Sequence, residues 1–230
     1  MLNYRIAPEL LVPFVPRGCE LDVYDGHAYV SVVGFLFADT RVRGLAIPFH
    51  RTFEEVNLRF YVRRVVHGEV RRAVTFLREF VPRRAIAYVA RWLYNEPYRA
   101  VPMSSEFLGA PGGRVPARSL YRAGPIELAV ETAGSTLALV PGSLQEFIAE
   151  HYWGYTAQRD GGTIEYRVAH RPWRVAPATS ASLRGDLVAA FGTTFAPVLA
   201  GTAHSAWLAD GSPVTVFSPT RLTPSRAVEA

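Results

Sequence analysis

Four polar side chains alternate along one short stretch of the sequence, at Glu55, Asn57, Arg59 and Tyr61. Residues two apart on a β-strand point to the same side of a sheet, so these four would share one face. A carboxylate can exchange a proton, a guanidinium binds carboxylates and phosphates, and an amide and a phenol donate hydrogen bonds. The spacing therefore predicts a strand face that is either wet or lined by a ligand.

The residues between them are apolar, which predicts a strand over residues 53–65. They are Val56, Leu58, Phe60 and Val62. Two interpretations are open: the polar face meets solvent over an apolar core, or it lines the interior of a barrel. In the second, a buried Glu55–Arg59 pair would satisfy its own charges and leave guanidinium donors for an anionic ligand.

The basic residues narrow the chemistry further, because all 25 of them are arginine and the chain has no lysine. Without lysine, no side chain can form a Schiff base, bind pyridoxal phosphate covalently or complete a Gly-Lys-Ser/Thr phosphate loop. Arginine keeps its charge at every accessible pH and its planar fork fits carboxylates and phosphates. A functional cation in this protein is therefore expected to bind an anion.

Histidine and cysteine give no metal signal. The 6 histidines show neither HxxxH nor HxH spacing, and the single cysteine, Cys19, allows no intramolecular disulfide and no cysteine-cluster site. We expect no metal and no cofactor. His170, next to Arg171-Pro172-Trp173, is interpreted either as a hydrogen-bonded core residue or as an acid or base at the mouth of a barrel.

The remaining patterns predict short strands joined by tight turns, with a few short helices. We expect hairpins around Asp25-Gly26, Asp160-Gly-Gly162 and Asp210-Gly211, the last joining residues 202–208 to 213–217. Further predicted elements are strands at 73–80, 126–131 and 135–140, a loop at 104–118, and helices from Pro82 to about 93, at 143–150 and at 182–191. This order favours a mainly antiparallel, barrel-like α+β fold.

The 230 residues contain no long Gly/Ser/Pro linker, which predicts a single domain over residues 1–230. No apolar run reaches the ~18 residues of a membrane helix and no export signal is visible, so a cytoplasmic protein is expected. Residues 41–99 carry 13 arginines against 5 acidic residues. They show no nucleic-acid-binding motif, and a solvated arginine-rich surface is the favoured interpretation.

One stretch resembles the signature of the YqjF-like proteins, a conserved bacterial family of unknown function. Residues 48–62 read Pro-Phe-His-Arg-Thr-Phe-Glu-Glu-Val-Asn-Leu-Arg-Phe-Tyr-Val. Residues 90–98, 150–155 and 169–173 match later blocks of the family in order and spacing, so the resemblance covers about residues 8–220. The family is in turn similar to acetoacetate decarboxylase, which implies a closed antiparallel barrel around a polar cavity.

The resemblance also implies residue roles. Glu55 takes the place of an active-site glutamate, Arg91 lies in the middle segment, and Pro97-Tyr98-Arg99 stands where the decarboxylase has a Pro-Lys-Lys triplet. Since the lysines are replaced, the scaffold is expected without Schiff-base chemistry. On this basis Glu55 is the candidate acid or base, Arg59 and Arg91 hold a carboxylate, and Tyr98 donates a hydrogen bond. Asn57, Tyr61 and His170 complete the candidate ligand-binding set.

The sequence thus favours a protein that binds a small carboxylate, with catalysis left open and a homo-oligomer compatible with the fold. The alternative is a non-catalytic ligand-binding or interaction protein, and a more remote one is nucleic-acid binding through the arginines of residues 41–99. Whether the polar face of residues 55–61 is enclosed or meets solvent separates these interpretations.

Overall fold

The computed structural model describes residues 1–38, 41–42, 45–46, 52–83, 97–109 and 115–222. The helix predicted after Pro82 lies outside these ranges. The described strands are β1 (Leu2–Ile6), β2 (Glu20–Leu21), β3 (Ala28–Phe37), β4 (Arg41–Val42), β5 (Leu45–Ala46), β6 (Phe53–Val66), β7 (Glu69–Val81), β8 (Tyr98–Ala100), β9 (Met103–Leu108), β10 (Arg118–Ala123), β11 (Ile126–Thr132), β12 (Leu137–Ala138), β13 (Trp153–Ala157), β14 (Thr163–Ala169), β15 (Arg174–Gly185), β16 (Ser205–Ala209), β17 (Thr215–Val216) and β18 (Thr220–Leu222). The described helices are α2 (Leu144–Ala149) and α3 (Leu187–Leu199), with 3-10 turns η1 (Pro8–Leu10) and η2 (Val12–Phe14).

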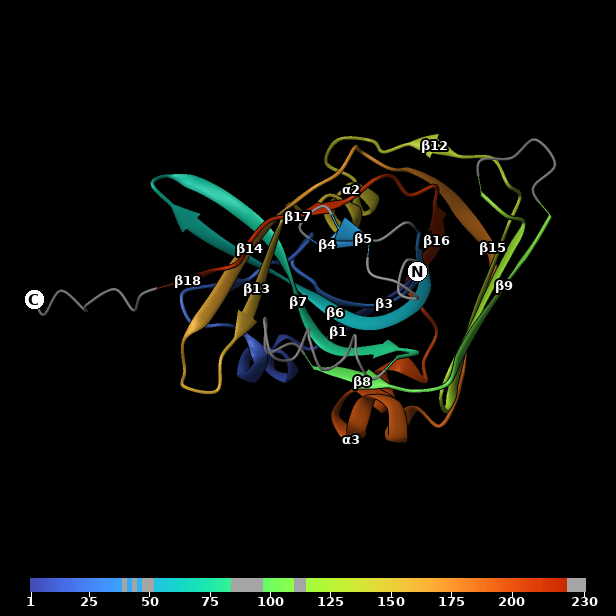
Figure 1. The fold of residues 1–230 in the computed structure, drawn as a ribbon, viewed down its shortest axis with the longest axis horizontal. Helices are drawn as coiled ribbons and strands as arrows, with labels where there is room; N and C mark the ends of the chain where they lie inside the picture. The colour runs from blue at the N-terminus through green and yellow to red at the C-terminus, as the bar shows by residue number, and fades with distance from the viewer. Residues whose placement is uncertain (39–40, 43–44, 47–51, 84–96, 110–114, 223–230) are drawn as a thin grey trace, which may run out of the picture.

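Most of these strands form one curved sheet, in the order β17-β14-β13-β7-β6-β3-β1-β16-β15-β11-β10-β9. Its pairs are antiparallel except for the parallel contacts of β7 with β8 and with β13. Figure 1 shows the sheet bending around in a wide arc, with α3 outside it. Within the described residues the ladders form an open path, so the mainly antiparallel fold is confirmed and closure of the barrel is not.

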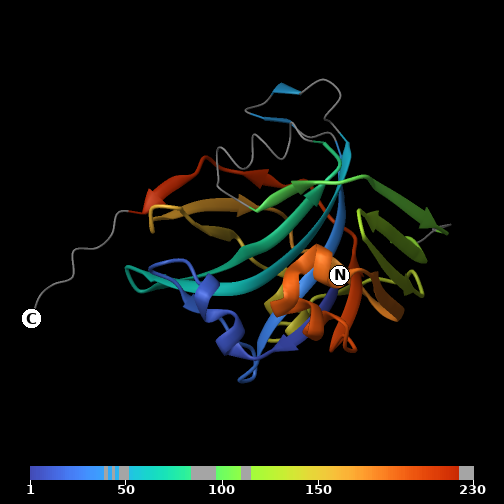
Figure 2. The same ribbon diagram turned by 90° about the horizontal axis from the view of Figure 1, so that it is seen from below.

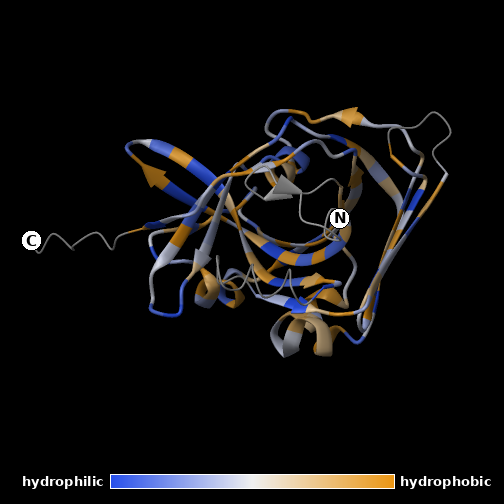
Figure 3. Cartoon of the chain, in the orientation of Figure 1, coloured by the Kyte–Doolittle hydropathy of each residue, from blue (hydrophilic) through white to orange (hydrophobic). Residues whose placement is uncertain are grey.

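The long hairpin of β6 and β7 is the centre of the sheet. The predicted strand at 53–65 is confirmed as β6, which pairs with β3 on one side and β7 on the other. Figure 3 shows the alternation of hydrophilic and hydrophobic residues along this hairpin as successive coloured bands. A bulge after Leu58 places Arg59 opposite Phe76. Such bulges bend a strand and strengthen its twist, in keeping with the curvature of the sheet.

Two hydrophobic clusters cover opposite faces of this central sheet. Val56, Leu58 and Phe60 pack in the larger one, together with Phe191 and Phe195 of α3. The smaller one contains side chains from the other face of the sheet and from α2, among them Tyr29, Tyr61, Phe147, Ile148 and Trp207. Because each face is covered, both sets of alternating residues on β6 are largely removed from water between Phe53 and Val62.

The first and last parts of the chain meet in the sheet. β1 lies between β3 and β16, with Asn3 opposite both Ser31 and Ser205. Figure 2 shows β1 in blue next to the red strand β16. The central sheet therefore requires residues from both ends of the described chain.

Several predicted turns are confirmed. Tyr24 and His27 form a bridge around Asp25-Gly26, where both turn residues have positive φ, at 49° and 73°. Left-handed geometry at both central positions is typical of a tight hairpin turn. The hairpin at 160–162 joins β13 to β14, and α2 begins after Ser143, whose Oγ accepts a hydrogen bond from the Glu146 N–H at 3.2 Å.

Other element predictions are wrong. Residues 103–108 form β9 rather than a loop, and 182–185 continue β15, so α3 begins only after Asp186. The predicted hairpin at Asp210-Gly211 is absent, because β16 pairs with β1 and β15 whereas β17 pairs with β14. Non-local pairing decides these segments, and local turn signals do not report it.

Candidate functional site

The polar face of β6 is enclosed. Glu55 is 2% exposed, Asn57 and Tyr61 are fully buried, and Arg59 is half-buried. The interpretation that this face meets solvent is wrong, because α2 and the smaller hydrophobic cluster cover it. Buried polar and charged groups are costly unless they are hydrogen-bonded or paired, so the partners of each group indicate what the face can do.

The Glu55 carboxylate is held by two predicted site residues. Asn57 Nδ2 donates to Oε1 at 3.0 Å, and the Tyr98 hydroxyl donates to Oε2 at 3.3 Å. Tyr98 reaches this position because β8 runs parallel to β7, in register with Glu79. Glu79 lies opposite Asn57 in the β6–β7 ladder and is 1% exposed, so the face contains a second buried carboxyl group.

Arg59 has a different partner from the one predicted. Its Nη2 donates to the Ile148 carbonyl at 3.2 Å, in the last turn of α2. Unpaired carbonyls at a helix C-terminus attract cations, which explains why the Arg59 guanidinium bonds the Ile148 carbonyl. The expected Glu55–Arg59 ion pair does not occur among the described contacts. Arg59 Nε is buried and has no hydrogen-bond partner.

Tyr61 belongs to a chain of hydrogen bonds that joins four strands, β6, β3, β1 and β16. Its hydroxyl lies 2.6 Å from Ser31 Oγ, and Ser31 Oγ donates to Asn3 Oδ1 at 2.7 Å. Asn3 Nδ2 donates in turn to the Ser205 carbonyl at 3.2 Å. This chain fixes the ring of Tyr61, and the Arg59 guanidinium carbon lies 5.9 Å from the centre of that ring.

His151 is a site residue that the sequence did not predict. It follows α2 directly, is 6% exposed, and stacks on Tyr61 with 4.9 Å between ring centroids. Neither ring nitrogen makes a hydrogen bond of good geometry, although the nearby Ile148 carbonyl favours the protonated ring. Burial, with the nearby charges of Arg59 and Arg72, holds the pKa of His151 well below its usual value of 6.5, so the imidazole is neutral at pH 7. His151 lies in residues 150–155, a block that resembles the YqjF-like family, but neither that block nor the spacing of the histidines indicated a role for it.

The other predicted site residues lie elsewhere or outside the description. His170 is half-buried and stacks between Tyr152 and Trp173, with centroid distances of 4.9 and 4.5 Å. Its Nδ1 lies 2.9 Å from the Arg171 carbonyl. His170 is therefore part of an aromatic stack and not of the β6 face. Arg91 lies outside the described residues.

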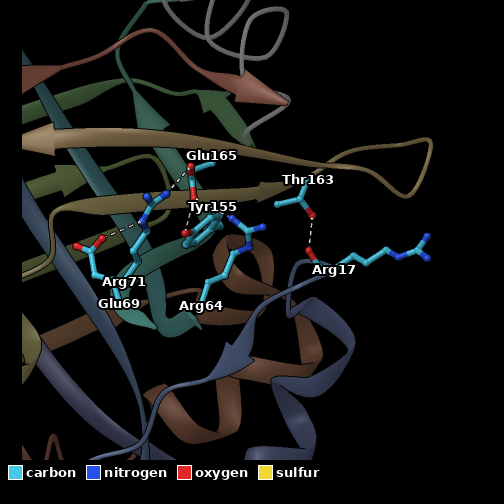
Figure 4. A network of polar contacts seen from close by, with 7 residues as sticks. All are labelled: Arg17, Arg64, Glu69, Arg71, Tyr155, Thr163 and Glu165. Atoms are coloured by element: carbon cyan, nitrogen blue, oxygen red, sulfur yellow. Dashed lines mark hydrogen bonds and ion pairs between the residues drawn. The ribbon is translucent and has the colours of Figure 1, made fainter. Parts of the chain in front are cut away.

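A second polar network joins the β6–β7 hairpin to the β13–β14 hairpin (Figure 4). Glu165 binds Arg71 at 3.0 Å and Arg64 at 3.3 Å, and it accepts a hydrogen bond from the Tyr155 hydroxyl at 2.6 Å. Burial and this hydrogen bond raise the pKa of Tyr155. The Arg71 guanidinium also lies 4.1 Å from the centre of a Trp153 ring. Since the carboxylate already engages both arginines, we interpret this network as structural.

Within the described ranges, no group of three His, Cys, Asp or Glu side chains could hold a metal ion. The same part of the chain contains no helix long and apolar enough to cross a membrane.

Comparison with known sequences gives two findings. A family model for DUF2071, described as an uncharacterized conserved protein, matches residues 1–219. The uncharacterized protein YqjF of Bacillus subtilis (strain 168) is 39% identical over 61 residues, which are 26% of this chain and 25% of YqjF. The matched region thus spans about a quarter of that relative.

Comparison with solved structures gives the fold. An acetoacetate decarboxylase-like enzyme from Sphingomonas wittichii RW1 superimposes with a TM-score of 0.57 and 14% identity, over 96% of this chain and 89% of that one. The enduracididine biosynthesis enzyme MppR, complexed with pyruvate, gives 0.56 and 14%, over 96% and 83%. Acetoacetate decarboxylase from Legionella pneumophila gives 0.51 and 11%, over 80% and 69%. At these identities the similarity establishes the fold alone.

Proposed function

This chain belongs to the DUF2071 family of uncharacterized conserved proteins and has an acetoacetate decarboxylase-like fold. On that basis we propose that it binds a small carboxylate on the face of β6 that carries Glu55, Asn57, Arg59 and Tyr61, here called the inner face of β6. One of its structural neighbours, MppR, is described in complex with pyruvate, a ligand of this class. The proposal includes the closed barrel that the resemblance implies, a cytoplasmic location and no nucleic-acid partner.

The proposal rests mainly on the hydrogen bonding of the Arg59 guanidinium. Its guanidinium lies on an enclosed face, its Nη2 contacts a neutral carbonyl, and its buried Nε has no hydrogen-bond partner. Buried donors without partners are rare in folded proteins. A ligand carboxylate would supply both the missing acceptor and a negative charge.

The proposed roles of the other residues follow from their positions. Glu55, held by Asn57 and Tyr98, is the candidate acid or base, and Tyr61 lies beside the cation. Arg91 remains a proposed second contact for the anion, and His170 is assigned no contact on this face. Because the chain has no lysine, any reaction here proceeds without a Schiff base on a side chain. A non-catalytic protein that binds the same ligand is the alternative.

Nucleic-acid binding is not favoured, because many arginines of the basic segment have acidic partners. Arg63 binds Glu20 at 3.2 Å and Arg72 binds Asp22 at 2.8 Å. With Glu165 between Arg64 and Arg71, these pairs reduce the positive potential that a phosphate backbone would meet.

The test of the proposed function is calorimetric titration of small carboxylic acids into the parent protein and two variants. We expect Arg59→Gln to bind at least tenfold more weakly, since the variant lacks the cation that pairs with the carboxylate. Arg63→Gln is the matched control, because Arg63 lies on the same strand but is exposed and pairs with Glu20. It should bind as the parent does.

Thermal unfolding provides an independent readout. A ligand at 100 times its dissociation constant stabilises the folded state by about 2.7 kcal/mol, so the parent should melt at a higher temperature with ligand present. Absence of any carboxylate-dependent shift in the parent, or equal binding by parent and Arg59→Gln, would contradict the proposal.

A further inference from the structure

The inner face of β6 contains hydrogen-bond acceptors as well as donors without partners. His151 is neutral, so one of its ring nitrogens carries a hydrogen and the other a lone pair, whichever tautomer is present. Both nitrogens are buried without a hydrogen bond of good geometry, and the nearby Ile148 carbonyl could accept only from the ring N–H, which leaves the ring lone pair unmet. Asn57 Oδ1, on the same face as Arg59, is a further buried acceptor without one. A carboxylate has no hydrogen to give to any of these acceptors.

Arg59 and His151 lie around the same ring. The Arg59 guanidinium carbon is 5.9 Å from the centre of the Tyr61 ring, and the centroid of His151 is 4.9 Å from it. Arg59 also bonds the Ile148 carbonyl, three residues before His151. A small ligand whose carboxylate meets Arg59 would therefore bring its neighbouring atoms close to the imidazole.

The donors and acceptors on this face indicate which group the ligand carries next to its carboxylate. A keto oxygen only accepts hydrogen bonds, so it could satisfy the ring N–H but neither the ring lone pair nor Asn57 Oδ1. A hydroxyl both donates and accepts. A second anionic group near the imidazole would meet Arg72, but the Arg72 guanidinium already pairs with Asp22 at 2.8 Å. The buried atoms without partners include acceptors, such as Asn57 Oδ1, and donors, Arg59 Nε and Trp207 Nε1, so a group that both donates and accepts suits this face better than one that only accepts.

We propose that the ligand is a hydroxycarboxylate, with its carboxylate on Arg59 and a hydroxyl hydrogen-bonded to His151. This inference rests on the proposed carboxylate binding and adds the class of ligand. It makes His151 the residue that determines specificity, since the carboxylate alone does not require it.

The experiment compares ligands that differ at one carbon atom, by calorimetric titration at pH 7. Lactate, pyruvate and propionate form one series, and 3-hydroxybutyrate and butyrate form a second. We expect at least one hydroxy acid to bind the parent about tenfold more tightly than its deoxy partner, because an unmet buried hydrogen bond opposes binding of the latter. Within the first series, lactate should also bind more tightly than pyruvate.

Two variants assign this preference to His151. His151→Phe keeps a ring that can stack on Tyr61 but removes both nitrogens, so it should bind hydroxy and deoxy acids within about twofold of each other. Its affinity for the deoxy acid should stay close to that of the parent. His204→Phe is the matched control, because His204 also lies against a tyrosine, Tyr29, at 5.6 Å, but is exposed. It should keep the preference for the hydroxy acid.

The possible failures are distinguishable. If every acid binds through Arg59 but hydroxy and deoxy acids bind equally, the imidazole is satisfied by water, and the hydroxycarboxylate inference fails while the proposed function stands. Tighter binding of pyruvate than of lactate, or a preference retained in His151→Phe, would also overturn the inference. If no acid in either series binds the parent, both proposals fail.

Discussion

Glu55 and His151 are both buried on the inner face of β6, but their surroundings differ. Glu55 accepts hydrogen bonds from Asn57 and Tyr98, whereas the imidazole of His151 lies among aromatic rings and near two cations. The Glu55 carboxyl group is surrounded by donors, while burial and the charges of two arginines keep the imidazole of His151 neutral. The two groups are therefore suited to different parts of one ligand.

The protonation of His151 links stability to pH. In the unfolded chain it takes up a proton as the pH falls through about 6.5, whereas in the folded protein it stays neutral to a much lower pH. The stability that this difference contributes is fully present above pH 6.5 and is lost as the pH falls below it. We expect the parent to lose more stability than His151→Phe between pH 7 and pH 5, by at most about 2 kcal/mol.

Urea unfolding of both proteins at a series of pH values measures this difference. Carboxyl groups titrate in both, so subtracting the two curves isolates the histidine. His204→Phe should change the pH dependence less, because His204 is exposed, although burial and the charge of Arg5 also lower its pKa. Parallel curves for the parent and His151→Phe would mean that the folded protein can protonate His151 at little cost.

For individual residues, the sequence predicts the position of a side chain only where polar and apolar residues alternate. The alternation at 55–61 predicted which four side chains share a face, and the structure confirms that they do, with Glu55, Asn57 and Tyr61 buried. It could not predict that Arg59 bonds the Ile148 carbonyl, because that partner lies 89 residues away. His151 was missed for the same reason: only tertiary packing places it on Tyr61.

Among the elements, the two long hairpins are held together by charge as well as by backbone hydrogen bonds. Glu165 of β14 lies between Arg64 of β6 and Arg71 of β7, and all three side chains are largely buried, at 11%, 26% and 19% exposure. The direct ladder between the hairpins is short, with Trp153 and Gly154 paired to β7. The carboxylate therefore reinforces a junction with few backbone contacts.

Replacing this carboxylate should weaken the junction. We expect Glu165→Gln to lower the unfolding free energy by about 2–3 kcal/mol, because two desolvated guanidinium groups lose their counter-charge. Glu20→Gln is the control: Glu20 also binds an arginine, Arg63, but both side chains are exposed, and the cost should stay under about 1 kcal/mol. Equal effects in denaturant unfolding would show that the network contributes no more than a surface ion pair.

Turns and helix caps can be predicted from the sequence where a few adjacent residues determine them. Asp25-Gly26 and the helix cap at Ser143 were identified correctly, since a turn or a cap is determined by a few adjacent residues. The helix expected at 182–191 is present but begins only at Leu187, because β11 pairs with residues as far as Gly185 and keeps them extended. β16 and β17 were wrongly joined, since each finds a partner far away in the sequence.

For the whole molecule, strand order argues that the chain unfolds as one unit. β1 lies between β3 and β16, so neither an early nor a late segment can leave without breaking a central ladder. We expect a single cooperative transition, with coincident denaturant curves from circular dichroism and from tryptophan fluorescence. Two separated transitions would contradict the single-domain prediction.

The place of β1 also affects how the protein emerges from the ribosome. Asn3 bonds Ser205 across 202 residues of sequence, so one side of β1 has no partner until Ser205 has been translated. At about 5–20 residues per second, this wait lasts roughly 10–40 seconds, during which an unpaired strand edge is exposed. The nascent chain should therefore depend on chaperones that shield such edges.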